Sequence, residues 1–348
     1  MKDVVKIGVA GLGTVGAGTV KLLSEHRDLL TDRSGRQIVV TAVSARDRTR
    51  DRGFSTEGLT WYDDARDLAA DKDIDILVEL IGGSDGIAYD TCKAALENGK
   101  HVLVEKPLCQ SSSECLILEQ EAAHRNLVLM VGHVFLFNPS ILKVKEIIRS
   151  GNLGKVFYLE AHRTNLGPVR QDVNAIWDLT SHDISIFNFL LDAEPLSASA
   201  VGSKALDGKM EDTTFVTFRY PDSILAHAHA SWLNPKKVRQ ITIVGKSKML
   251  TWDDIDIAHP IRIYDSNVTF ETKYSDSFAA HRMNYNRGDV IMPQVEGGEP
   301  LRNECMAFVE SILNETPAPS DGSIGRKVVA TLEAADRSLK SNGAFVEI

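Results

Sequence analysis

Cysteine is scarce in this sequence. The 348 residues include 4 cysteines, and no two of them form a Cys-x-x-Cys pair: they are Cys92, Cys109, Cys115 and Cys305. This spacing lacks the usual zinc-binding and dithiol patterns, and it does not form the dense disulfide framework of a small secreted domain. We therefore expect four free thiols.

Long apolar runs and an excess of positive charge are missing as well. No stretch approaches the roughly 18 apolar residues of a membrane span, and Met1 to Ile7 mixes charge into its apolar run, unlike a secretory signal. The net charge of −9 argues against a broad basic surface for nucleic acid or anionic membrane. We expect a soluble, cytoplasmic protein with a small-molecule partner.

A chain of this length is long for one compact core and suits two domains, which we place at residues 1–132 and 133–348. The first domain opens on an apolar, β-branched run from Val4 to Val9. A glycine-rich turn follows, and then helical spacing from Thr19 to Leu23; the turn contains Gly11, Leu12, Gly13, Thr14, Val15 and Gly16.

Each glycine of this turn has a physical purpose in a strand–turn–helix unit. Gly11 permits the tight turn, Gly13 lets the backbone approach a pyrophosphate, and Gly16 lets helix and strand pack closely. Further buried strands are expected at residues 38–43, 74–80 and 101–104. The pattern predicts an α/β, doubly wound parallel sheet, the Rossmann fold, that binds NAD or NADP.

The residues after the second strand bear on the choice of cofactor. An acidic residue there usually holds the ribose 2'-hydroxyl of NAD, whereas this chain has Ser44, Ala45 and Arg46, with Arg48 and Arg50 nearby. The guanidiniums suit the 2'-phosphate of NADP. A solvated basic loop balanced by Asp47 and Asp51 explains the same residues, and between the two we favour NADP slightly.

Lys106 follows the fourth strand, which places it at the carboxyl edge of the sheet where ligands bind. Pro107 biases it away from helix and towards a turn. Asp178 and His182 are four residues apart, so a helix from 178 to 188 would put both on one face. We interpret His182 as the acid/base, Lys106 as the group that steadies the reacting oxygen, and Asp178 as an acceptor for substrate hydroxyls.

Two further polar patterns have alternative interpretations. Arg163, Asn165 and Arg170 could grip the diphosphate of a nucleotide-sugar or belong to an exposed loop. His227 and His229 alternate on one face of a strand. With no cysteine or carboxylate fixed beside them, we predict no metal site and favour a half-polar sheet face at a subunit contact.

The second domain reads as a mostly antiparallel open sheet with one backing helix, an α+β arrangement. Strands are expected at 156–161, 198–201, 213–219, 224–230, 240–244 and 249–251, and closing helices at 304–314 and 324–339. Because an open sheet with an apolar face is a liability in a monomer, we expect a homodimer or homotetramer.

Two family resemblances meet near residue 104. The first hundred residues resemble the nucleotide-binding domain of homoserine dehydrogenases, especially at 11–16, 43–47 and Val78 to Gly83. From Glu105-Lys106-Pro107 onward the chain resembles the glucose-fructose oxidoreductase / inositol dehydrogenase / MocA family, through Gly132-His133, Asn138-Pro139 and Trp177 to Asp183. The resemblance implies that Ile81, Gly82, Glu105 and Lys106 contact cofactor and that His133 contacts substrate.

The resemblance implies an oxidoreductase that moves a hydride between nicotinamide and a secondary alcohol of a sugar or nucleotide-sugar, at C3 if the substrate is a UDP-sugar. Two alternatives are kept. The first hundred residues favour a homoserine dehydrogenase, and a dinucleotide-binding sensor or scaffold without turnover is the non-enzyme alternative.

Overall fold

The computed structural model describes residues 4–82, 86–206, 208–275 and 278–348, and the chain divides into two compact units. Unit 1 comprises residues 1–133 and 301–330, and unit 2 comprises residues 134–300 and 331–348. Helix α9 (Gly322–Lys340) contributes its first part to unit 1 and its second part to unit 2. Gly83, a member of the resemblance pattern, lies outside the described residues.

Unit 1 is built on a six-stranded parallel sheet in the order β3-β2-β1-β4-β5-β6. The strands are β1 (Val4–Ala10), β2 (Gln37–Ser44), β3 (Thr60–Tyr62), β4 (Ile76–Glu79), β5 (His101–Glu105) and β6 (Leu129–Gly132). The order reverses between β1 and β4, and that switch point is where open α/β sheets bind ligands. The predicted doubly wound parallel sheet is confirmed.

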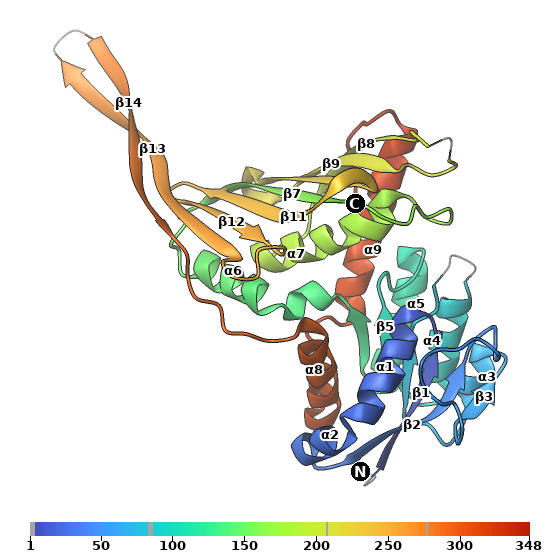
Figure 1. Cartoon of the computed structure of the whole chain (residues 1–348). Helices are drawn as coiled ribbons and strands as arrows, with labels where there is room; N and C mark the ends of the chain where they lie inside the picture. Colours follow the sequence, from blue (N-terminus) through green and yellow to red (C-terminus); the bar gives the residue numbers. More distant parts are fainter. Residues whose placement is uncertain (1–3, 83–85, 207, 276–277) are drawn as a thin grey trace. The chain divides into compact units, whose positions relative to one another are not determined.

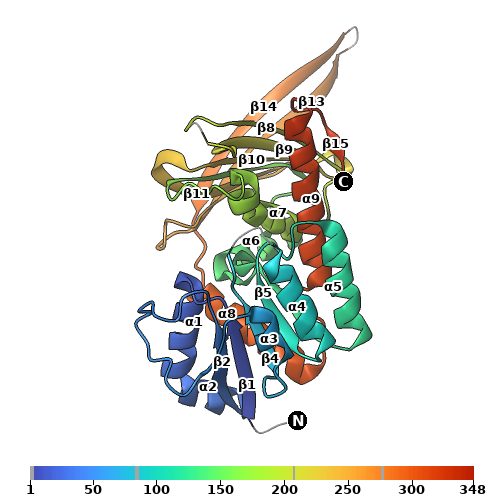
Figure 2. The same cartoon turned by 90° about the vertical axis from the view of Figure 1, so that its right-hand side faces the viewer.

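Helices lie on both faces of this sheet (Figures 1 and 2). They are α1 (Thr14–Glu25), α2 (Arg27–Ser34), α3 (Ala65–Ala70), α4 (Ile87–Glu97), α5 (Ser112–His124) and α8 (Pro300–Asn314). Helices α3, α4 and α5 pack side by side. The central strands are mostly apolar, with Val9, Leu77 and Val102 fully buried, as expected for a parallel sheet covered on both sides.

Unit 2 contains a nine-stranded sheet in the order β14-β13-β12-β11-β7-β10-β9-β8-β15. Its strands are β7 (Val156–Leu166), β8 (Ser197–Ser203), β9 (Thr213–Arg219), β10 (Leu225–Ser231), β11 (Leu233–Gly245), β12 (Met249–Asp253), β13 (Ile261–Ser275), β14 (Phe278–Ile291) and β15 (Val346–Glu347). Among the described strand pairs of this nine-stranded sheet, only β7 and β10 are parallel. The predicted antiparallel open sheet is confirmed, while β13 and β14 were not anticipated.

One face of the nine-stranded sheet carries helices α6 (Pro139–Arg149) and α7 (Ser181–Leu191) (Figure 1). Small side chains let these helices approach, since Ala226, Ala228 and Ala230 of β10 alternate inward and are fully buried. The short helical turns of this unit are η1 (Val134–Phe137), η2 (Ile176–Thr180) and η3 (Pro221–Ser223). Polar bonds fix the packing, for example the indole of Trp252, which donates to the Ser140 hydroxyl at 2.7 Å.

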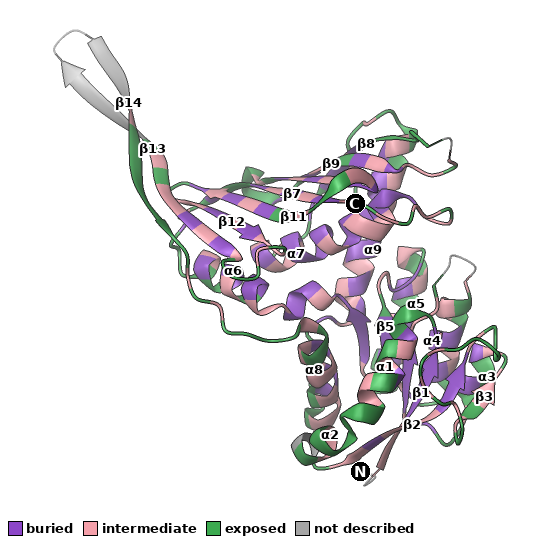
Figure 3. Ribbon diagram, in the orientation of Figure 1, coloured by how far each residue is buried: buried purple, intermediate pink, exposed green. Residues whose placement is uncertain are grey.

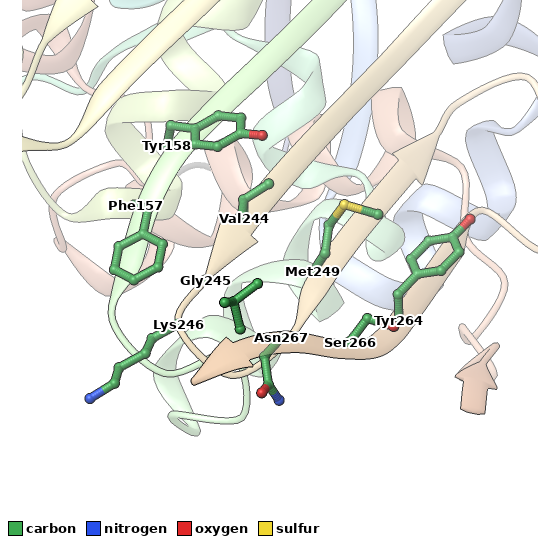
Figure 4. A pocket seen from close by; sticks show the side chains of 10 residues that line it. Phe157, Tyr158, Val244, Gly245, Lys246, Met249, Tyr264, Ser266 and Asn267 are labelled. Carbon is green, nitrogen blue, oxygen red and sulfur yellow. The ribbon is translucent and has the colours of Figure 1, made fainter. Parts of the chain in front are cut away.

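The opposite face of this sheet is partly exposed (Figure 3). It includes a pocket of about 460 Å³ into which aromatic side chains of β7 project (Figure 4). Phe157 and Tyr158 are 48% and 44% exposed there, and β11, β12 and β13 complete the lining. Strand β13 pairs with β12 only through Ile261 to Tyr264, and beyond Ser266 it pairs with β14 alone.

No helix among the described residues combines the length and the apolar character needed to cross a membrane. All four cysteines carry free thiols, and three of them are buried.

Candidate functional site

The surroundings of the three glycines in the turn after β1 explain why a side chain is absent at each of them. Gly11 has a φ of +97°, and a Cβ there would lie 2.5 Å from the Leu80 carbonyl oxygen. A Cβ on Gly16 would lie 1.9 Å from the carbonyl oxygen of Gly11, so only glycine allows α1 to pack this closely. A Cβ on Gly13 would meet no atom within 4 Å, which leaves the backbone open to a ligand.

A pocket of about 550 Å³ opens beside this turn at the switch point of the sheet. Its lining includes eight residues expected to bind cofactor: Gly11, Leu12, Gly13, Ser44, Ala45, Arg46, Ile81 and Gly82. Thr14, Val15 and Gly16 instead begin α1, where their amides belong to the first turn. The predicted cofactor residues of the first half of the unit are thus brought together.

The same pocket has lining residues that the sequence analysis missed. They come from the segment after β3, from the residue after β4, from the start of α4 and from the loop after β2: Asp63, Asp64, Ala65, Arg66, Leu80, Ile87 and Arg52. A weak signal was present, since Asp64 precedes a short helical run and caps α3 by accepting from the Arg66 amide at 2.8 Å.

The carboxylates around this pocket are each bonded to a near neighbour. Asp47 accepts from the amide and the hydroxyl of Thr49, which lowers its pKa. Asp63 accepts from the Trp61 indole at 3.1 Å, and Asp64 pairs with Arg66 at 2.6 Å. Arg46, Arg50 and Arg52 line the pocket beside them. The basic loop is therefore part of the pocket wall.

Glu79 ends β4 as a buried acid, 2% exposed, directly before the cofactor-facing turn. Its carboxyl accepts a hydrogen bond from the Ile81 amide at 2.5 Å. Burial raises the pKa of Glu79 to about 8, and the nearby Glu105 charge adds to the shift. This burial was not predicted, because a glutamate at the end of an apolar run looks like an ordinary strand end.

Lys106 and His133 follow β5 and β6 at the carboxyl edge of the sheet. Lys106 lies on a bend and is joined to Pro107 by a cis peptide bond. His133 is 1% exposed, and its pKa is lowered to about 3 by burial and by the positive charge of Lys106. Neither of its ring nitrogens has a hydrogen-bond partner among the described residues. His133 is therefore a neutral imidazole beside a lysine.

Asp178 and His182 lie in consecutive helical turns of unit 2. The helix expected from residue 178 is observed as a π-helical segment, η2, that runs into α7 at Ser181. Such π segments are rare in proteins, and those that occur are often found at functional sites. The segment is held by Asp336, which accepts from the side-chain amide of Asn174 at 2.9 Å and from the Trp177 indole at 2.7 Å.

The surroundings of the two side chains differ. The Asp178 carboxylate accepts from the Trp232 indole at 3.1 Å and from the Arg170 guanidinium at 3.5 Å, so donors on two sides fix its orientation. The His182 ring is half-buried and packs edge-on against Phe135, with ring centroids 5.1 Å apart. An oriented carboxylate and an imidazole one turn apart can accept a hydroxyl proton and hold a neighbouring hydroxyl.

Arg163 lies elsewhere than the sequence suggested. Strand β7 continues to Leu166, so Arg163 is inside the strand, 3% exposed, and donates to the buried Asp183 carboxylate at 2.7 and 3.0 Å. A guanidinium committed to a buried carboxylate is not offered to a diphosphate. Arg163 thus ties β7 to α7 through Asp183, the residue after His182. Its expected contact with substrate stays a prediction, which this buried ion pair does not favour.

Asn165 and Arg170, the other two residues expected to contact a diphosphate, differ in their surroundings. Asn165 is half-buried on β7. Arg170 donates chiefly to Asp172, with the Nε atom 3.0 Å from its carboxylate, and only secondarily to Asp178. The Arg170 guanidinium is therefore already bonded to two carboxylates, those of Asp172 and Asp178.

The paired histidines of β10 lie on the exposed face of the sheet. His229 stacks on Phe215 with centroids 4.4 Å apart, and His162 of β7 contacts it edge-on at 5.7 Å. Burial lowers the pKa of His227 and of His229. Within the described part of the chain, no three acidic, cysteine or histidine side chains gather as a metal site would require.

Family models match both units of the chain. Residues 5–133 match an oxidoreductase family with an NAD-binding Rossmann fold, and residues 141–251 match the GFO/IDH/MocA C-terminal domain. Among solved structures, UDP-N-acetylglucosamine 3-dehydrogenase of Acidithiobacillus ferrooxidans superposes with a TM-score of 0.74 at 22% identity, covering 97% of this chain and 98% of that one. Levoglucosan dehydrogenase in complex with NADH and L-sorbose gives 0.79 at 16% identity, covering 99% of both chains.

Curated relatives repeat the two resemblances. Inositol 2-dehydrogenase 2 of Saccharopolyspora erythraea is 30% identical over 197 residues, 56% of this chain and 56% of that protein, so the match spans little more than half of either. The Acidithiobacillus enzyme is 26% identical over 70% of this chain and 72% of its own. Homoserine dehydrogenase of Methylobacillus glycogenes is 38% identical over 99 residues, 28% of this chain and 24% of its own. The chain belongs to the Gfo/Idh/MocA family of NAD-binding oxidoreductases.

Proposed function

We propose that this chain is an NAD(P)-dependent dehydrogenase that acts on a secondary alcohol of a sugar or nucleotide-sugar. The observation that carries the proposal is the turn bearing Asp178 and His182, in which Trp232 and Arg170 orient the carboxylate. The relatives that oxidise inositol or UDP-N-acetylglucosamine support a polyol or sugar substrate, and the second of them suggests C3 of a UDP-sugar.

The residues of unit 1 fit a dinucleotide. Gly13 leaves its surroundings open, and α1 begins at Thr14, so its first amides are available to a pyrophosphate. Bound nicotinamide would supply the hydride acceptor. His182 would take the hydroxyl proton. The carbinol hydrogen would leave with its bonding electron pair, as a hydride, to the nicotinamide, and the alcohol would become a ketone. Lys106 would steady the charge that develops on oxygen, and Asp178 would accept bonds from sugar hydroxyls.

The cofactor is proposed to be NADP. The carboxylates that line the pocket, Asp47, Asp63 and Asp64, each accept a bond from a near neighbour, as described above, so the usual acidic ligand of a ribose 2'-hydroxyl has no obvious counterpart. Arg46 and Arg50 line the same pocket, and the guanidinium group is well suited to pair with a 2'-phosphate.

Turnover of a substrate panel tests the proposal. Purified protein is incubated with NAD⁺ or NADP⁺ and with UDP-sugars, free sugars, inositol or homoserine, and reduced nicotinamide is followed by absorbance. We expect a sugar-type substrate to be oxidised, with kcat reduced about 10²–10⁴-fold in His182→Ala and in Lys106→Met. The exposed His259→Ala and Lys72→Met are the matched controls. Near-normal turnover by both site variants would contradict the assigned roles.

A homoserine dehydrogenase is the second candidate, because a stretch of 99 residues is 38% identical to such an enzyme. Turnover of homoserine alone in the same panel would select it. Binding of cofactor with no turnover of any substrate would favour a sensor or scaffold.

A further inference from the structure

Arg52 donates to three main-chain carbonyls in two segments around the cofactor pocket. Its Nη1 donates to the Arg50 carbonyl at 2.7 Å, its Nη2 donates to the Asp47 carbonyl, and its Nε donates to the Leu12 carbonyl at 3.3 Å. The first two carbonyls belong to the loop after β2, and Leu12 lies in the glycine turn. One guanidinium therefore holds this loop against the glycine turn.

A tryptophan backs this connection. Trp61, on the edge strand β3, has Arg52 5.4 Å and Arg48 5.7 Å from its ring centroid, distances typical of cation–π contacts. Trp61 itself is fixed by pairing with Val43 of β2 and by its indole, which donates to Asp63. The side chain of Arg52 is thus held by three carbonyls and by an aromatic ring on the rigid sheet.

The loop that Arg52 holds carries the exposed arginines of the pocket. In the sequence Arg46 precedes Asp47 and Arg50 follows it, and both arginines line the pocket. Asp47 is turned to Thr49 within the loop by two hydrogen bonds, of 2.8 and 2.7 Å. An ordered loop of this kind can present two guanidiniums to a dianion without first losing conformational freedom.

We propose that Arg52 is a positioning residue that selects the 2'-phosphate of the cofactor by holding the loop from Arg46 to Gly53 in its binding form, with Trp61 as its support. Arg46 and Arg50 are the residues that contact the phosphate. This inference rests on the proposed use of NADP. Lysine cannot replace Arg52, because an ammonium is a point charge, whereas the planar guanidinium reaches three separate carbonyls.

Two cofactor fragments separate selection from general binding. 2',5'-ADP carries the extra phosphate and 5'-AMP does not, and the affinity of each is measured by isothermal titration calorimetry for wild type, Arg52→Lys, Arg52→Met, Trp61→Phe and Trp61→Leu. Arg125→Met is the control, because Arg125 is an arginine of unit 1 paired with Glu121 on α5, outside the pocket. Thermal unfolding verifies that each variant is folded.

We expect wild type to bind 2',5'-ADP about tenfold or more tighter than 5'-AMP, as one charge-assisted contact would provide. Both Arg52 variants should lose most of this ratio while their affinity for 5'-AMP changes little. Trp61→Leu should lose part of it, and Trp61→Phe should keep it because the phenyl ring preserves the stacking surface. In turnover assays, KM for NADP⁺ should rise in the Arg52 variants while kcat is maintained.

Three outcomes would overturn the inference. If Arg52→Lys keeps the wild-type ratio, the positive charge of Arg52 matters and its fork does not, so Arg52 is a direct phosphate ligand. If both fragments weaken equally in the Arg52 variants, Arg52 only supports the fold of the pocket. If wild type itself shows no preference for 2',5'-ADP, the proposal of NADP fails, and the selection role of Arg52 fails with it.

Discussion

Glu79 and His133 are buried ionisable side chains at the ends of β4 and β6 of the same sheet, and burial shifts the pKa of each in the direction that favours its neutral form. For Glu79 the folded-state pKa of about 8 lies well above the ordinary 4.5 of the unfolded chain. The native state therefore keeps a proton that the unfolded state has lost. The stability that this proton provides is complete below about pH 4.5 and disappears as the pH rises through 8.

Glu79→Gln should remove this dependence. The difference in free energy of unfolding between variant and wild type is expected to grow in favour of the variant by up to ~1.4 kcal/mol per pH unit between about pH 5 and pH 8, and then to level off. Urea titrations at several pH values measure it. Glu97→Gln, on the exposed side of α4, is the control and should follow wild type. A parallel pH profile for Glu79→Gln would contradict the buried-acid assignment.

At the scale of single elements, the start of α1 depends on Gly16 but not on Gly18. A Cβ on Gly16 would collide with the Gly11 carbonyl oxygen, whereas a Cβ on Gly18 would meet no atom within 4 Å. Gly16→Ala should displace the glycine turn and weaken NADPH binding by about tenfold or more, measured by nucleotide fluorescence. Gly18→Ala should bind normally and gain roughly 0.5–1 kcal/mol of stability, because alanine is the better helix residue.

Helix α6 depends on the cap at Asn138. The Asn138 side-chain oxygen accepts from the Ser140 amide at 2.9 Å and from its hydroxyl at 2.6 Å, and the same hydroxyl accepts from the Trp252 indole. Asn138→Ala should cost about 1–2 kcal/mol in the free energy of unfolding. Asn138→Asp keeps the acceptor and should recover most of that loss. Equal stability of Asn138→Ala and wild type in chemical denaturation would show that the cap is dispensable.

At the scale of the whole molecule, the exposed sheet face predicts self-association. Phe157 and Tyr158 are nearly half exposed beside an apolar pocket, and β13 continues as a two-stranded ribbon, which is marginally stable alone in water. We expect a homodimer or homotetramer by light scattering. Phe157→Glu combined with Tyr158→Glu should shift it towards the monomer, while Ile257→Glu, at a 93% exposed position outside the pocket, should not. A monomeric wild type would disprove the expectation.

Much of the architecture could be predicted from local sequence. Gly11, Gly13 and Gly16 after a β-branched run identified the first strand, turn and helix, because the whole glycine pattern lies within six consecutive residues. Strands β7 to β12 were predicted from their alternation of polar and apolar side chains. Strands β13 and β14 were missed: beyond Ser266, β13 pairs with β14 alone among the described pairings, so its partner is a strand that the sequence analysis did not expect either.

The sequence by itself determined the two fold types, the glycine cradle and the placement of Lys106, Asp178 and His182 at strand or helix ends, because these follow from short-range spacing. Only the tertiary structure decided which polar side chains are committed to others. It paired Arg163 with Asp183, gave Asp178 its two donors, buried Glu79 and placed Arg52 across three carbonyls. Those partners lie from 2 to 54 residues apart, and their geometry depends on strand order and helix packing, which no local pattern encodes.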